Sequence, residues 1–278
     1  MKRYTDTFRP KRTIGRCIYC GAGNGTLTKE HLVPLSLNGH FVLHKASCKT
    51  CMDRTQGIEY EVCHRYFFEP RTVLKMSSRH PHHRPPSFPL QVESKGQRQT
   101  VMVPVEEMFP YWAFPIYGQP TCLAETAGRT RTGSILVKRH EEMIGDLSRC
   151  QRILRDHNAD TVDLKSKLRG HFLPRFLAKI AYGFAVEEFG VEPLLNSAYV
   201  LPAILDDSSD IGKWVGNTDS LSPQQQCLHM IRLAIEDGNI CAFIVLFGNR
   251  APVPEYQVVV GPAPQAQSAE IEAEFIVA

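Results

Sequence analysis

Residues 17–61 read CIYCGAGNGTLTKEHLVPLSLNGHFVLHKASCKTCMDRTQGIEYE and decide the fold of the N-terminal part of this chain. Two Cys-x2-Cys pairs flank this stretch, Cys17 with Cys20 and Cys48 with Cys51. Each pair predicts a tight turn that directs two thiolates at one point. Four thiolates make a closed tetrahedral set, which suits structural Zn²⁺. A unit of about 50 residues buries too little apolar surface to fold alone, so we predict that this zinc replaces the missing core.

The sequence between and after the cysteine pairs predicts two strands followed by a helix. Apolar and β-branched residues favour strands at 27–33 and 40–45, with a turn at Asn38-Gly39 between them. A helix is expected over residues 50–68, and Pro70 closes it. The expected order is therefore ββα.

The dipeptide Glu30-His31 lies at the end of the first predicted strand. Neighbouring strand residues point to opposite faces, so the two serve one site only if the strand ends or bends there, as Pro34 favours. Phosphodiester hydrolysis needs a group that deprotonates water and a cation at the phosphate. Histidine suits the first role, and a carboxylate oxygen suits Mg²⁺ or Mn²⁺ in the second.

Helical spacing indicates where a second metal ligand could come from. Four residues fall on one stripe of the expected helix, at intervals of four, three and four: Cys48, Met52, Thr55 and Glu59. That stripe faces the predicted hairpin. We therefore expect Glu59 to join Glu30 as a ligand of the catalytic divalent ion.

The segments CIYCG, LTKEHLVPLSL and ASCKTCMDRTQGIE resemble the HNH endonuclease superfamily in its form with a cysteine-bound zinc. The resemblance implies a ββα-metal fold, His31 as general base, Glu30 as metal ligand, and products with 5′-phosphate and 3′-hydroxyl ends. Glu59 matches the glutamate of a T-x-x-x-E variant that begins at Thr55. One departure is Met52, which stands where the family often has asparagine.

Charge is divided unevenly along the chain. Residues 1–100 carry 17 Lys and Arg against 7 Asp and Glu, whereas residues 101–278 carry 15 against 22. The basic front predicts a nucleic-acid partner, with DNA expected rather than RNA. We expect the phosphate backbone of the nucleic acid to contact the basic arm 1–16 and four side chains: Lys29, Lys45, Lys49 and Arg54.

Residues 76–278 are expected to form a mixed α/β domain of unassigned role, after a zinc-containing module at 1–75; the whole chain is then α+β. Short strands are predicted within 90–138, a helix over 173–189, and paired core strands at 242–247 and 256–261. The Arg, His and Pro residues at 79–84 could bind phosphate or a metal, but their prolines prevent the regular spacing of a ligand helix, so a solvated basic loop within a connector is expected.

The longest apolar run, residues 240–247, is too short to cross a bilayer, so no membrane contact is expected. No apolar segment follows the basic N-terminus, which predicts a cytoplasmic protein with reduced cysteines. If the protein is a nuclease, a role in phage or bacterial defence is expected. Whether it forms a homodimer or binds a regulatory protein is left open by the sequence. The alternative is a zinc-ribbon module that binds nucleic acid or serves as an adaptor without catalysis, and Met52 is its main support.

Overall fold

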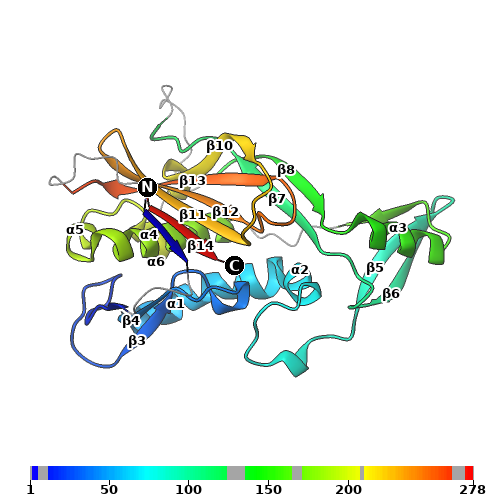
Figure 1. The fold of residues 1–278 in the computed structure, drawn as a ribbon, viewed down its shortest axis with the longest axis horizontal. Coiled ribbons are helices and arrows are strands. Elements are labelled where there is room, and N and C mark those ends of the chain that lie inside the picture. Colours follow the sequence, from blue (N-terminus) through cyan, green and yellow to red (C-terminus); the bar gives the residue numbers. More distant parts are fainter. Residues whose placement is uncertain are drawn as a thin grey trace.

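A computed structural model describes residues 2–5, 12–123, 135–164, 171–206, 210–264 and 273–277. Within these residues the chain forms a mixed α+β fold with several sheets, as predicted (Figure 1). None of the helices in this part of the chain is long and apolar enough to cross a membrane.

The N-terminal unit has the predicted ββα order. Strand β3 (Leu27–His31) pairs antiparallel with β4 (Val42–Cys48), and helix α1 (Lys49–Glu61) follows at once. The register of β3 and β4 shifts between Thr28 and Glu30, where Lys45 on β4 adopts a φ of 50°. Such a bulge re-aims the side chains beside it. Because β3 ends at His31, Glu30 and His31 stand where the strand stops.

The helix after β4 is shorter than predicted and changes its winding. Helix α1 passes into a π-helical turn, Val62–Tyr66, and then into α2 (Phe68–Val73). A π turn inserts an extra residue per turn and is often found at functional sites. It rotates the residues that follow Glu61 relative to an ideal α-helix.

A six-stranded sheet forms the largest layer, with the order β1-β14-β11-β12-β13-β10. Its strands are β1 (Lys2–Thr5), β10 (Val215–Ser222), β11 (His229–Glu236), β12 (Asn239–Leu246), β13 (Val253–Pro262) and β14 (Ala273–Val277). The predicted pairing of segments 242–247 and 256–261 is confirmed by β12 and β13, which pair antiparallel.

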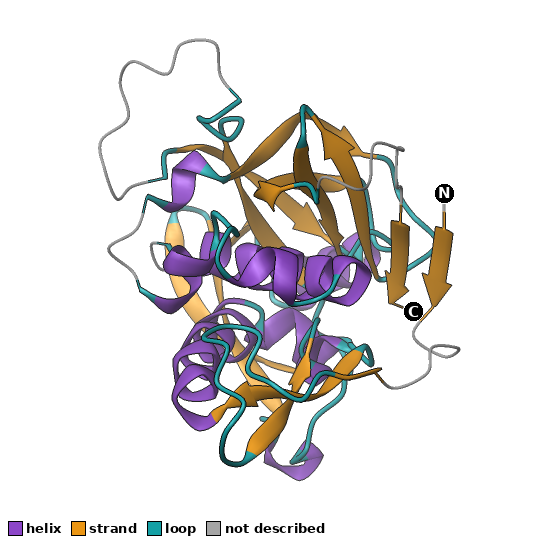
Figure 2. Cartoon of the chain, turned by 90° about the vertical axis from the view of Figure 1, so that its left-hand side faces the viewer, coloured by secondary structure: helices purple, strands orange, loops and turns teal. Residues whose placement is uncertain are grey.

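Helix α4 (Phe172–Phe189) confirms the helix predicted at 173–189 and lies between the six-stranded sheet and the ββα unit (Figures 1 and 2). Every residue from 173 to 187 is buried, because the helix contacts the sheet on one side and α1 on the other. The main hydrophobic core accordingly contains residues from both sides of position 75. The division into domains at that position stays a prediction.

The remaining elements complete the fold around these layers. A hairpin of β7 (Tyr111–Tyr117) and β8 (Val137–Ile144) leads to a smaller sheet, β6-β5-β9, with its own core against α3. The strands of this smaller sheet are β5 (Ser87–Ser94), β6 (Gln97–Pro104) and β9 (Thr161–Asp163), and the helix beside it is α3 (Leu147–Asp156). Two short helices follow α4, namely α5 (Glu192–Leu195) and α6 (Leu201–Leu205). The described residues of the predicted basic arm pair with the body: β1 pairs with β14, and β2 (Arg12–Thr13) pairs with β4.

A buried histidine joins the large sheet to the turn that follows the Glu30-His31 pair. Phe247 N donates to Nδ1 of His229 at 3.1 Å, so Nε2 carries the proton and donates to the Leu37 carbonyl at 3.0 Å. Burial lowers the pKa of His229 from 6.5 to about 4, against a smaller raising effect of the Leu37 carbonyl. The folded protein therefore holds this imidazole neutral.

We expect His229 to make the protein acid-sensitive. The folded form takes up this proton only near pH 4, whereas an unfolded chain takes it up near pH 6.5. The free energy of unfolding should thus fall by up to about 3 kcal/mol as the pH drops through that window, and the loss is absent above it. Urea unfolding of the wild type and His229→Gln at several pH values checks this; equal pH slopes for the two proteins would contradict it.

Candidate functional site

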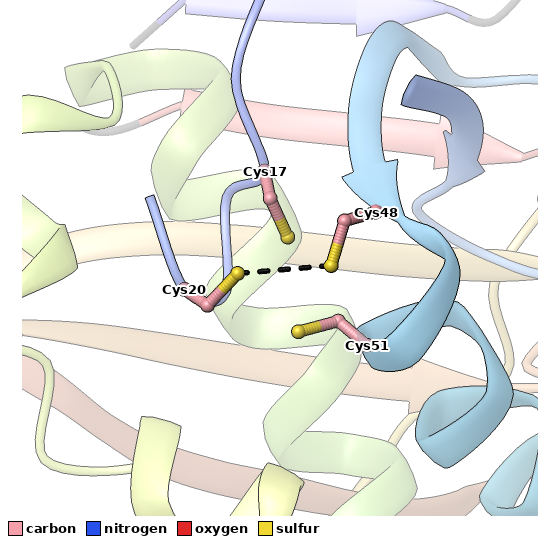
Figure 3. Close-up of side chains that lie close together, drawn as sticks. All are labelled: Cys17, Cys20, Cys48 and Cys51. Carbon is pink, nitrogen blue, oxygen red and sulfur yellow. Dashed lines mark hydrogen bonds between the residues drawn. The ribbon is translucent and has the colours of Figure 1, made fainter. Parts of the chain in front are cut away.

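The four cysteines of the two pairs come together at one end of the ββα unit. Cys17 and Cys20 lie in the turn before β3, Cys48 ends β4, and Cys51 lies in the first turn of α1. Their sulfur atoms lie within 4.8 Å of one another, and all four thiols are free of disulfides. Figure 3 shows the four side chains pointing at a common centre.

The spacing of the sulfur atoms fits a metal. A tetrahedral ion with Zn–S bonds near 2.3 Å places its sulfurs about 3.8 Å apart. The Sγ atoms of Cys20 and Cys48 lie 3.7 Å apart, as Figure 3 marks. The backbone N–H of Cys51 is the main cause that lowers the pKa of Cys48 to about 7, which favours a thiolate. Burial raises the pKa of Cys17 and Cys51, so a bound cation would be needed to hold those two deprotonated. The cluster is consistent with the predicted structural zinc site.

Glycine is required where the first cysteine turn meets the rest of the protein. Gly21 has a φ of 74°, and a Cβ there would lie 2.7 Å from Leu195 Cδ2. The Gly21 N–H donates to the Cys17 carbonyl at 2.9 Å, which closes the turn.

Glu30 and Glu59 approach each other, as the helical stripe predicted, but a lysine lies between them. Nζ of Lys179 lies 2.6 Å from Glu30 Oε1 and 2.8 Å from Glu59 Oε1. The same atom donates to the His31 carbonyl at 3.0 Å, so all three ammonium protons have acceptors. Glu30 also accepts a hydrogen bond from the Tyr19 hydroxyl at 3.0 Å.

Lys179 comes from α4 and is 1% exposed. Burial by itself lowers the pKa of this lysine, but the charges of Glu30 and Glu59 outweigh burial and hold the pKa above its ordinary value. One turn further along α4, Tyr182 donates to the Ile18 carbonyl inside the first cysteine turn. Helix α4 is therefore bonded both to the cysteine turn and to the Glu30-His31 strand.

Sequence reasoning missed Lys179. A signal existed, because a lysine in the middle of the otherwise apolar stretch 176–186 is almost never buried without a partner. The partner could not be identified, since the backbone atom that Lys179 contacts lies 148 residues away in the chain.

His31 lies at the edge of an open pocket of about 420 Å³. Burial, followed by the positive charge of Lys29, lowers the pKa of His31 to about 4, and Glu59 opposes this shift. The imidazole is therefore neutral near pH 7, in the form that accepts a proton. Glu59 lines the same pocket, whereas Glu30 does not and is 5% exposed.

The arrangement does not fit a divalent ion between Glu30 and Glu59. Mg²⁺ requires oxygen ligands near 2.1 Å in an octahedron, usually with several waters. The Lys179 ammonium is bonded to both carboxylates at that position. In the described part of the chain, the four cysteines are the only group of three or more Cys, His, Asp or Glu ligand atoms within 4.8 Å of one another.

The remaining predicted site residues lie outside the pocket. Lys29 on β3, Lys45 on β4, and Lys49 and Arg54 on α1 are all exposed, and Lys49 forms an ion pair with Asp53. Met52 faces the hairpin, with its Sδ 3.5 Å from Thr28 Oγ1.

Three residues that sequence reasoning left out of the site line this pocket: His64 on the π turn, Arg71 on α2, and Arg79 after it. Arg79 belongs to the segment read as a solvated basic loop, and His80 from that segment lines the pocket as well.

Comparison of the chain with protein-family models, curated proteins and solved structures gives no match.

Proposed function

We propose that this protein is an HNH-type endonuclease that hydrolyses phosphodiester bonds of DNA. The observation that carries the proposal is the convergence of His31 and Glu59 on one pocket, with Glu30 joined to Glu59 through Lys179. These residues come from the ββα unit whose motifs resemble that superfamily.

In the proposed reaction His31 takes a proton from a water molecule that attacks the phosphorus atom. The bond from phosphorus to the 3′ oxygen breaks, the departing oxygen takes a proton from solvent water, and the products carry a 5′-phosphate and a 3′-hydroxyl. The lowered pKa of His31 keeps the imidazole unprotonated at neutral pH, and it also makes His31 a weaker base than an ordinary histidine. Glu59 flanks the pocket, and Lys179 fixes its carboxylate together with that of Glu30.

The superfamily resemblance implies a catalytic Mg²⁺ or Mn²⁺, which would polarise the phosphate and stabilise the departing oxygen. The proposed ligands Glu30 and Glu59 do not fit that ion while Lys179 bonds both.

The exposed cations of the ββα unit support DNA as the partner. Lys29, Lys45 and Arg54 lie on the surface of this unit and can neutralise phosphates without reading bases. Binding should therefore weaken steeply with salt. A cytoplasmic location, a role in phage or bacterial defence, and a homodimer or a regulatory partner belong to this proposal as further expectations.

A non-catalytic zinc-ribbon module that binds nucleic acid or a protein is the second candidate. Two observations favour it: Met52 stands at the position of the usual asparagine, and an ammonium stands between the two carboxylates. Both reduce the set of ligands available to a divalent ion.

A plasmid-nicking assay with Mg²⁺ and with Mn²⁺ tests the enzyme against the module. We expect His31→Ala to lower the cleavage rate by about 10²- to 10⁴-fold, because the general base is lost. Zinc content and the thermal midpoint should stay unchanged. His40→Ala is the matched control, since His40 is exposed and lies outside the pocket. Absence of cleavage with either metal, with DNA binding retained, would favour the module.

A further inference from the structure

Arg71 is a buried cation with no carboxylate partner in the described part of the chain. It is 6% exposed, and its Nη1 donates to the Cys63 carbonyl at 3.1 Å. The same nitrogen lies 3.2 Å from Nδ1 of His64. Burial lowers the pKa of Arg71, with the charge of Arg84 acting in the same direction. A buried charge without a counter-ion is costly, so this guanidinium favours an anion beside it.

The pocket next to His31 is where that anion fits. Arg71 lines it, and so do further groups that can donate hydrogen bonds to an anion: Ser77, Ser78, Arg79 and His80. The loop that carries them is held in place, because Ser77 N donates to Asn38 Oδ1 at 2.8 Å and His80 N donates to Ser78 Oγ at 3.1 Å. The planar fork of an arginine matches the paired oxygens of a phosphate.

Among the described residues, one acidic group also lines the pocket, namely Glu59. Its Oε1 is bonded to the Lys179 ammonium at 2.8 Å, which offsets its repulsion of an anion. Arg79 stands close enough to His31 for its charge to lower the pKa of that imidazole. The cations and the proposed base therefore belong to one site.

We propose that this pocket binds one phosphodiester group of the nucleic acid, with Arg71 as its buried cation and Arg79 as a second one at the rim. The inference rests on the proposed function and names the part of the substrate that the site binds. It places the phosphate next to His31, where a deprotonated water would attack it.

Calorimetric titration with the dinucleotide dTpdT, without added divalent ions, tests the proposal. Inorganic phosphate and dTMP serve as the monoester probes. We expect dTpdT to bind the zinc-loaded full chain, and Arg71→Lys and Arg79→Ala to raise its Kd about tenfold each, because a charge-assisted hydrogen bond is lost. Arg152→Ala is the control, as Arg152 is an exposed arginine on α3 outside the pocket. Each variant is first checked for an unchanged thermal midpoint.

Several results would overturn the assignment: no binding of dTpdT, an unchanged Kd in both pocket variants, or binding of the monoesters alone. The outcome is separable from that of the nicking assay. If dTpdT binding depends on Arg71 but no cleavage occurs, the proposed nuclease activity is rejected and the proposed phosphodiester-binding pocket is retained. If cleavage depends on His31 but is unaffected by Arg71→Lys and Arg79→Ala, the proposed phosphodiester-binding pocket is rejected and the proposed nuclease activity is retained.

Discussion

Removal of the metal from the four-cysteine cluster is expected to unfold the ββα unit. Structural zinc contributes an apparent ~10–16 kcal/mol in small zinc domains, and four separate thiols of the ββα unit would share this ion. We expect one zinc per chain in the purified protein. Cys51→Ser should abolish it and lower the thermal midpoint by at least about 10 °C, since each kcal/mol is worth about 2–4 °C in a chain of this size.

The unfolding should reach the rest of the site. Tyr19 and Ile18 lie inside the first cysteine turn, and they bond to Glu30 and to Tyr182 of α4. Loss of zinc is therefore expected to expose Tyr19 as well as the cysteines.

Elemental analysis and thermal melting measure both effects. Cys227→Ser is the matched control, because Cys227 is half-buried and outside the cluster. A zinc-free wild type, or a Cys51→Ser variant that retains both zinc and its midpoint, would refute the assignment.

Local patterns in the sequence predicted the elements that carry the site. The paired cysteines, the ββα order and helix α4 depend on spacing within short windows, and each is present. The predicted helix 50–68 missed the π turn at Val62–Tyr66, which no local pattern marks. That turn matters because it carries His64, which lines the pocket.

Contacts between distant segments could not be predicted in the same way. Glu59 lies on the helix stripe that the spacing predicted, but the cation that it contacts is the Lys179 ammonium of α4 and not a metal ion. A single sequence shows that Lys179 lies in the apolar stretch 176–186 and gives no register between that helix and β3. For the same reason local sequence predicts a solvated loop at residues 79–80, because nothing local shows that they line one pocket with His31.

Outside the cysteine cluster, replacement of Lys179 by methionine is expected to be the most damaging change of one side chain in the site. It leaves Glu30 buried with its negative charge uncompensated and Glu59 beside it. Breaking a buried ion pair by removing one partner costs about 3–5 kcal/mol. Urea unfolding at neutral pH should show a loss of this size with the zinc content unchanged, whereas Lys138→Met, at an exposed lysine on β8, should have little effect.

A second substitution distinguishes lost charge balance from lost packing. Glu30→Gln combined with Lys179→Met removes the uncompensated carboxylate, so the double variant should be more stable than Lys179→Met alone. If the two are equally unstable, the lysine acts through its packing. The single variant also vacates the position between Glu30 and Glu59 for another cation. Mn²⁺ should then stabilise Lys179→Met against urea more than it stabilises the wild type, because two carboxylates without an ammonium form the oxygen pair that a divalent ion prefers. An equal response of both proteins to Mn²⁺ would mean that these carboxylates are not poised for a metal even when the lysine is gone.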